Sequence, residues 1–303
     1  MSKEIRLDNR VAIITGAGAG LGRSHALLMA ARGARVVVND LGGRLDGTGA
    51  NQSAADGVVA EIRAAGGEAV ANYDTVATPE GAQSILNTAL DAYGTVDIVV
   101  NNAGIIRYKR LLEHTPEDFA VTLAVHLNGS YYLSMAAFPI MKEKRYGRLV
   151  FTSSSGGMRG SADGVAYGAA KAGVVGLANV MALAGAPYGV YSNVILPNAY
   201  TRMTEMVVAE RNREKVSAEF ISPLVLYLCS EQCQLNHEMF AVGGGTVART
   251  ILALAPGWRA GSRAEFNAEA IHAHLDEIMN MTNYSNPQTT EEETRLVVGR
   301  RRG

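Results

Sequence analysis

The stretch TGAGAGLGR at residues 15–23 follows directly on the apolar run RVAIIT at 10–15 and precedes a segment typical of a helix. Its alternating glycines allow tight turns and a close approach of the backbone to a ligand. Free N–H groups at a helix start bind anions such as a pyrophosphate, and the helix dipole favours them. The spacing T-G-x-x-x-G-x-G places Gly16, Gly20 and Gly22 at the critical positions, whereas the common G-x-G-x-x-G pattern does not fit. The stretch therefore predicts a strand, an anion-binding turn and a helix.

The rest of the chain repeats this alternation of short Val- and Ile-rich runs with longer amphipathic stretches. Strands that are apolar on both faces and separated by helices are typical of a parallel sheet covered on both sides. We expect seven strands, at 10–15, 34–40, 68–74, 96–102, 147–153, 191–197 and 239–243, and helices near 22–33, 51–66, 79–94, 116–145, 164–186 and 217–230. This order predicts a doubly wound α/β fold of the Rossmann type.

The domain organisation follows from where the alternation stops. With 303 residues, 48% of them hydrophobic, the chain can bury a large core. Beyond about residue 255 the pattern fades into a more polar tail. We therefore predict one domain at 1–254 and a partly helical C-terminal extension at 255–303.

The composition argues against several classes of partner. Lys and Arg number 28 against 29 Asp and Glu, so no charge excess points to nucleic acid or to an anionic membrane. No apolar run reaches membrane-spanning length, and the N-terminus lacks an apolar signal core. Cys229 and Cys233 stand without a nearby His, so we expect them to pack in the core and predict no metal site. These features predict a soluble, cytoplasmic protein that acts on a small molecule.

A carboxylate stands where a bound nucleotide would place its ribose. The second predicted strand ends at Asp40, 18 residues after Gly22. An acidic side chain there accepts hydrogen bonds from the adenosine ribose and repels a 2′-phosphate. Ala19 in the glycine turn adds no positive charge, although Arg44 is near in sequence. We therefore expect NAD in preference to NADP; a solvated strand-end carboxylate is the alternative for Asp40.

Candidate catalytic side chains follow the fifth predicted strand, in FTSSSGGMRGSADGVAYGAAK at 151–171. Tyr167 and Lys171 are four residues apart, so they share a face of a helix that begins near Asp163. A tyrosine with a pKa near 10 is a poor base at neutral pH, but a nearby cation favours its phenolate. Ser154 lies 13 residues before Tyr167. The tyrosine and the lysine together indicate a phenol whose ionised form is stabilised.

Together these motifs resemble the short-chain dehydrogenase/reductase family. They comprise TGxxxGxG at 15–22, NNAG at 101–104, Ser154, and YxxxK at 167–171, in the family's order and at its spacings across roughly residues 10–250. The resemblance implies an oxidoreductase that interconverts a secondary alcohol and a ketone with a nicotinamide cofactor.

The same resemblance implies a role for each site residue. Tyr167 would be the general acid/base, Ser154 would hold the substrate oxygen, and Lys171 would lower the tyrosine pKa and bind the nicotinamide ribose. Asn101 could instead make only a structural hydrogen bond, and Asn198 could bind the nicotinamide or merely shape its turn. The expected cofactor-binding residues are Gly16, Gly20, Leu21, Gly22, Asp40, Asp74, Asn101, Ala103, Gly104, Tyr167, Lys171, Pro197 and Asn198.

Longer stretches look like one branch of the family, whose members oxidise (3R)-3-hydroxyacyl-CoA esters with NAD and are also known as 17β-hydroxysteroid dehydrogenases. These stretches are VVVNDLGG (36–43), AVANYDTV (69–76), KEKRYGRLVFTSS (142–154) and LPNAYTRMT (196–204). We therefore expect an acyl-CoA substrate, with a steroid as the alternative.

Two further segments would suit such a substrate. Arg107, Lys109 and Arg110 are candidates to bind CoA phosphates, although most such clusters are solvated surface. The Met-rich segment 199–208 suits a lid over a bulky apolar group.

Other functions fit the residues less well. A biosynthetic 3-oxoacyl reductase would use NADPH, which Asp40 disfavours. A catalytically silent NAD-binding scaffold would not need Ser154, Tyr167 and Lys171 together. The family resemblance also implies a homodimer or homotetramer packed through the helices at 116–145 and 164–186.

The segment LAVHLNGSYY at 123–132 departs from the family pattern N-[LV]-x-G, because His126 occupies the place of the catalytic Asn. In the family this position bends the helix, and its main-chain carbonyl holds a water linked to the active-site lysine. His, Asn and Gly are poor helix formers, which suits a distorted backbone. We therefore expect His126 to act through its backbone, with a titrating side chain as the alternative.

Overall fold

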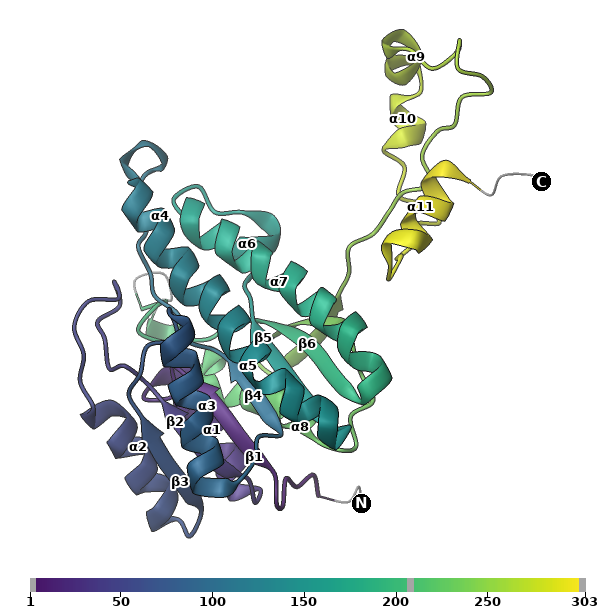
Figure 1. Cartoon of the computed structure of the whole chain (residues 1–303). Coiled ribbons are helices and arrows are strands. Elements are labelled where there is room, and N and C mark those ends of the chain that lie inside the picture. The colour runs from purple at the N-terminus through teal and green to yellow at the C-terminus, as the bar shows by residue number, and fades with distance from the viewer. Residues whose placement is uncertain (1–3, 206–209, 300–303) are drawn as a thin grey trace. The chain divides into compact units, whose positions relative to one another are not determined.

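A single sheet of eight strands, in the order β3-β2-β1-β4-β5-β6-β7-β8, forms the centre of the fold (Figure 1). The computed structural model describes residues 4–205 and 210–299. The strands are β1 (Val11–Thr15), β2 (Arg35–Asn39), β3 (Glu68–Asn72), β4 (Ile98–Asn101), β5 (Gly147–Thr152), β6 (Val190–Pro197), β7 (Glu238–Gly243) and β8 (Thr246–Thr250). The predicted doubly wound α/β fold is confirmed.

The first seven strands run parallel, and β1 lies between β2 and β4. Ile13 of β1 faces Val37 of β2 on one side and Val99 of β4 on the other. Strand order therefore reverses at β1, which leaves a crevice at the carboxyl ends of the strands. The glycine turn leaves β1 at this edge.

The eighth strand was not predicted. Only two residues separate β7 from β8, so the pair forms a hairpin and β8 runs antiparallel. The sequence of β8, TVART, lacks an apolar face, and four of its five residues are exposed. A strand that buries almost nothing leaves no hydrophobic period in the sequence.

Two layers of helices cover the sheet because side chains alternate between its faces. In β1, Ala12 and Ile14 join one apolar core with α1 (Gly20–Ala31), α2 (Ser53–Ala64) and α8 (Ser222–Cys229). Val11 and Ile13 join a second core with α3 (Pro79–Tyr93), α5 (Gly129–Lys144) and α7 (Val165–Gly185). Strands buried on both faces explain the continuous apolar runs in the sequence.

The predicted helix at 116–145 is interrupted. It consists of α4 (Pro116–Leu123), a π-helical turn (Ala124–Asn128) and α5. A second difference is the short helix α6 (Ser155–Arg159), which the sequence did not predict. Both differences lie beside the predicted catalytic residues.

One helix corrects an expectation about membrane spans. Val165–Tyr188, which comprises α7 and the 3-10 turn after it, is long and apolar enough to cross a membrane by length and composition. However, Val174 and Ala178 of α7 are buried in the second core, and Lys171 lies on the same helix. The apolar character of α7 is thus explained by its packing on the sheet.

The chain divides into two compact units, Met1–Arg249 and Thr250–Gly303. The second unit contains α9 (Ala268–Ala273), α10 (Leu275–Ile278) and α11 (Thr290–Val298). Trp258 stacks on His274 with 4.5 Å between the ring centroids, and none of the described residues of this unit is buried. The predicted lid at 199–208 lies partly outside the described residues, since these omit 206–209.

Candidate active site

The glycine turn has the geometry of an anion-binding loop. Gly16 and Gly20 adopt φ angles of +63° and +54°, and a Cβ on Gly22 would lie 2.2 Å from the carbonyl oxygen of Gly16. Helix α1 begins without a side-chain cap, because Ala19 occupies the N-cap position. Its first N–H groups are therefore available to a ligand.

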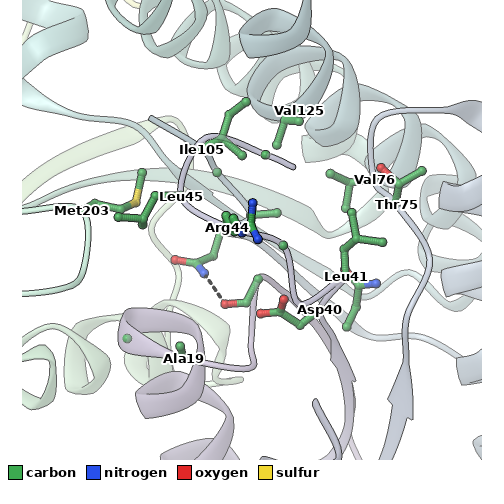
Figure 2. A pocket seen from close by; sticks show the side chains of 18 of the residues that line it. Ala19, Asp40, Leu41, Arg44, Leu45, Thr75, Val76, Ile105, Val125 and Met203 are labelled. Atoms are coloured by element: carbon green, nitrogen blue, oxygen red, sulfur yellow. Dashed lines mark hydrogen bonds between the residues drawn. The ribbon is translucent and has the colours of Figure 1, made fainter. Parts of the chain in front are cut away.

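A cavity of about 310 Å³ opens at this turn, at the carboxyl ends of the strands. In Figure 2, Asp40, Leu41, Thr75 and Val76 gather on one side, and Leu45 and Met203 lie on the other. Seven predicted cofactor residues line it: Gly16, Gly20, Leu21, Asp40, Asp74, Ala103 and Gly104. The structure thus brings the predicted adenosine side together in one cavity.

Asp40 is fixed in this cavity by the backbone around it. Its Oδ2 accepts a hydrogen bond from Gly18 N at 2.7 Å, and its Oδ1 accepts one from Gly42 N at 2.6 Å. A Cβ on Gly18 would come within 2.9 Å of Oδ2, so the turn needs glycine for this contact. Arg44 and Arg202 also line the cavity.

The two asparagines of the NNAG motif point in different directions. Asn101, the predicted residue, is buried and donates from Nδ2 to Ser134 Oγ at 2.9 Å, away from the cavity. Asn102 lines the cavity, and its Nδ2 donates to Thr15 O at 2.9 Å. Consecutive residues at a strand end face opposite sides of the sheet. The contacts of Asn101 therefore fit the alternative of a structural hydrogen bond. Asn102 lines the cavity in its place, and the prediction missed it.

Asp74, Pro197 and Asn198, which were also predicted to bind the cofactor, differ in whether they reach the cavity. Asp74 is exposed at the cavity and accepts from Ser84 Oγ at 2.6 Å. Pro197 ends β6, and Asn198 N donates to Val242 O at 2.8 Å. Neither Pro197 nor Asn198 lines the cavity, but Thr201 just beyond them does.

Ser154 and Tyr167 come together at the end of β5. Ser154 caps α6, where its Oγ accepts from Gly156 N at 3.1 Å. Burial raises the pKa of Tyr167 to about 12, and a hydrogen bond with Ser154 acts in the opposite direction. The phenol is therefore protonated at neutral pH in this arrangement.

Lys171 is held close to the tyrosine by a hydrogen bond to the main chain. Its side chain is buried, and Nζ donates to Thr152 O at 2.6 Å. Burial lowers the pKa of Lys171 to about 7. The ammonium lies 5.7 Å from the centre of the Tyr167 ring, but burial has the larger effect on the pKa of Tyr167, which is raised. The expected lowering of the tyrosine pKa by Lys171 is thus not seen in this arrangement.

His126 lies inside the π-helical turn, so the expected distortion of the helix is present. Its carbonyl accepts from Ser130 Oγ at 2.7 Å. Its imidazole also makes contacts: Nε2 lies 2.8 Å from Ile105 O and 3.1 Å from Ile105 N, while Nδ1 is buried without a partner among the described residues. Burial, chiefly, lowers the pKa of His126 well below 6.5, so the ring is neutral.

The basic cluster expected to bind CoA phosphates is largely paired within the protein. Asp118 accepts from Lys109 Nζ at 2.6 Å and from Arg107 Nη1 at 3.3 Å. Of the three cations, only Arg110 has no carboxylate partner within residues 4–205 and 210–299. The cluster therefore offers less free positive charge than the sequence indicated.

Residues 10–215 match the short chain dehydrogenase family. The chain is 44% identical over 299 residues to the peroxisomal multifunctional enzyme type 2 of Mus musculus. This match covers 98% of this chain and 40% of the mouse protein. The full-length peroxisomal multifunctional enzyme type 2 from Drosophila melanogaster superposes with a TM-score of 0.82 at 35% identity, over 97% of this chain and 49% of that chain. This chain thus spans less than half the length of these relatives.

A third relative was solved with ligands bound. It is a 7α-hydroxysteroid dehydrogenase in complex with NADH and 7-oxoglycochenodeoxycholic acid, with a TM-score of 0.71 and 28% identity over 79% of this chain and 95% of that chain. The glycine turn, the YxxxK motif and these matches lead to one conclusion. The chain belongs to the short-chain dehydrogenase family and is similar to peroxisomal multifunctional enzyme type 2.

Proposed function

We propose that this protein is an NAD-dependent dehydrogenase that converts (3R)-3-hydroxyacyl-CoA to 3-oxoacyl-CoA. One observation carries the chemistry: Ser154, Tyr167 and Lys171 meet at the end of β5, in a family member whose glycine turn opens onto a cavity. The likeness to the hydroxyacyl-CoA branch of the family, noted from four stretches of the sequence, supports the substrate.

The cavity fits the adenosine half of a dinucleotide. Gly16 and Gly20 expose backbone at the uncapped start of α1, where a pyrophosphate is favoured. Asp40 lies where the ribose hydroxyls would bind, and its carboxylate disfavours a 2′-phosphate. Asn102 lines the cavity and donates a hydrogen bond to the carbonyl oxygen of Thr15 at the end of β1. These residues support NAD as the cofactor, and the NADH in the related hydroxysteroid dehydrogenase supports a nicotinamide cofactor.

The catalytic side chains would then bind the substrate oxygen and transfer its proton. Ser154 Oγ donates a hydrogen bond to that oxygen, and Tyr167 Oη takes the hydroxyl proton during oxidation. Tyr167 must lose its own proton to solvent before it can take this one, and Lys171, with a pKa near 7, can carry the positive charge that stabilises the phenolate. Bound oxidised NAD would supply the acceptor for the hydrogen that leaves carbon and would add a second positive charge. In the reverse direction Tyr167 returns the proton to the ketone oxygen.

A 17β-hydroxysteroid is the second candidate substrate. The structure solved with a bile-acid steroid belongs to a relative that shares this fold over most of its length. The pairing of Arg107 and Lys109 with Asp118 also reduces the charge available to CoA phosphates. A steroid needs no such charge.

We also propose that the protein forms a homodimer or homotetramer in the cytoplasm. Large apolar side chains are exposed on the two predicted interface helices, with Tyr131 and Met135 on α5 and Val180 and Leu183 on α7. Apolar faces of this kind are common at interfaces between copies of a chain.

The test is NADH formation with matched panels of (3R)- and (3S)-3-hydroxyacyl-CoA esters and 17β-hydroxysteroids. We expect turnover of the (3R) esters, at a rate that exceeds that of both other panels. Turnover of steroids alone would replace the proposed substrate by the second candidate.

A further inference from the structure

The ring of Tyr167 packs against two other aromatic side chains. His126 lies at 5.3 Å between the ring centroids, with 87° between the ring planes. Tyr108 lies at 5.8 Å and 64°. Both arrangements are edge-to-face, which aromatic pairs favour. His126 is only 1% exposed, whereas Tyr108 is 47% exposed. Of the two neighbours of the catalytic phenol, His126 is thus enclosed by the protein, whereas Tyr108 reaches the solvent.

Tyr108 is anchored although half of its surface is exposed. Among the preceding residues, Ile105 bonds to His126 Nε2, and Ile106 N donates to Leu45 O at 2.7 Å. Arg107 Nε donates to Asp46 O at 2.8 Å.

Anchors follow Tyr108 as well. Lys109 donates to Asp118, and Asp118 belongs to the capping box of α4. The backbone on both sides of Tyr108 is therefore held by the rest of the protein.

The ring of Tyr108 also covers the start of the catalytic helix. A Cβ on Gly164, the residue before α7, would lie 3.2 Å from Tyr108 Cε1. Tyr108 therefore lies against both Gly164 and Tyr167, which fixes the direction of its ring. A substrate that brings a hydroxyl to Tyr167 would therefore come close to this half-exposed ring.

We propose that Tyr108 is a specificity-determining residue: its ring sets the width of the substrate channel at Tyr167 and shields the Tyr167 ring from water. The chemical class that fits is a secondary alcohol whose carbinol carbon carries a slim, unbranched chain. A ring attached to that carbon would collide with Tyr108. The channel width rests on the proposed function, whereas the shielding of Tyr167 does not.

The channel width is tested with two substrates that differ only at the carbinol carbon. They are (3R)-3-hydroxybutyryl-CoA and a 3-hydroxy-3-cyclohexylpropanoyl-CoA of matching configuration. We expect Tyr108→Ala to raise kcat/KM for the cyclohexyl ester relative to the butyryl ester by at least about tenfold, since filling or opening such a pocket changes discrimination by this order. Tyr108→Phe keeps the ring and should keep the wild-type ratio. An unchanged ratio in Tyr108→Ala would overturn the channel role.

The shielding is tested without turnover, by ultraviolet titration of the tyrosines. Tyr108→Phe and Tyr108→Ala both lack the Tyr108 phenol, so they differ only in whether a ring covers Tyr167. The other groups that face Tyr167 are Lys171 on its own helix, His126 in the π-helical turn and the Ser154 hydroxyl at α6. All three are unchanged in both variants.

Admitting water should lower the pKa of Tyr167 in Tyr108→Ala, on the order of one unit below that in Tyr108→Phe. Adding Tyr167→Phe to each variant identifies the signal. Equal titrations would overturn the shielding role. If the wild-type protein oxidises neither ester, the proposed function fails and the titration alone decides the role of Tyr108.

Discussion

His126 shows how one residue can combine a backbone and a side-chain role. Its backbone lies in the π-helical turn, while its imidazole bonds to Ile105 and packs on Tyr167. The pKa of the ring is far below 6.5, so it does not carry charge at neutral pH. These contacts favour a positioning role over a titrating one.

We predict that His126→Asn keeps most of the activity, with kcat/KM within about tenfold of wild type. Asn keeps a neutral polar side chain at this place, and as a poor helix former it keeps the turn distorted. His126→Leu is the matched control; it should destabilise the fold by about 1–3 kcal/mol because the Ile105 groups lose their partner. Initial rates and urea unfolding check both variants. A loss of activity in His126→Asn as large as in Tyr167→Phe would show that the side chain takes part in the chemistry.

We expect Asp40 to determine the preference for NAD over NADP. Its carboxylate faces the cavity while backbone N–H groups hold both oxygens. Asp40→Ala removes the negative charge, so the ratio of kcat/KM with NAD to that with NADP should fall, on the order of tenfold or more. Arg44 and Arg202, which line the same cavity, remain to attract a 2′-phosphate. A wild-type protein that already prefers NADP would refute the assignment.

Single residues were predictable where they match the spacings of the family motifs. Ser154, Tyr167, Lys171 and Asp40 follow from offsets along the chain, and the structure places the first three together. Asn102 was missed because the direction of a side chain after a strand depends on the pleat of that strand. The pKa values of Lys171 and Tyr167 depend on burial, which spacing does not report.

Elements were predictable where they bury an apolar face. All seven predicted strands are present, because each contributes side chains to one or both cores. Strand β8 buries almost nothing, and α6 consists of five residues that include two glycines. Neither carries a hydrophobic period. The π-helical turn depends on one extra residue in an otherwise helical stretch, which periodicity does not resolve.

The glycine turn is expected to bind NAD only while its backbone keeps its conformation. Gly22→Ala would place a Cβ 2.2 Å from Gly16 O, so the turn and the start of α1 must move. We expect NAD binding, measured by calorimetry, to weaken by at least about tenfold, because the backbone N–H groups lose their alignment.

Gly57→Ala in α2 is the control, since a Cβ there meets nothing within 4 Å. It should raise the free energy of unfolding by about 0.5–1 kcal/mol and leave NAD binding unchanged. Equal NAD affinities in the two variants would contradict the role of the turn.

At the scale of the whole molecule, two buried neutral histidines make stability depend on pH. Burial lowers the pKa of His25 to about 3, while an unfolded chain takes up that proton near pH 6.5. Between these values unfolding binds a proton, so acidification destabilises the fold by about 1.4 kcal/mol per pH unit for each such group. His126, with its lowered pKa, acts in the same direction.

For His25 the expected loss between pH 7 and pH 5 is about 2 kcal/mol in the free energy of unfolding. Urea unfolding at the two pH values measures it. His25→Gln removes this titration, so its loss should be smaller than that of the wild type by a similar amount. Identical losses in the two proteins would show that His25 is not held neutral.

The second unit marks the limit of what the sequence could predict for the whole molecule. The pattern indicated an extension with helices, and α9, α10 and α11 are present. Because the described residues of Thr250–Gly303 bury no side chain fully, they carry no pattern from which an internal packing could be inferred.

In the proposed mechanism, Tyr167 moves the proton in an NAD-dependent oxidation of a (3R)-3-hydroxyacyl-CoA. The most direct test compares NADH formation from that ester by the wild-type protein and by Tyr167→Phe, with NAD affinity measured for both. We expect turnover by the wild type, a loss of about 10²–10⁴-fold in kcat for the variant, and nearly equal NAD affinity. Unchanged turnover by Tyr167→Phe would contradict the mechanism.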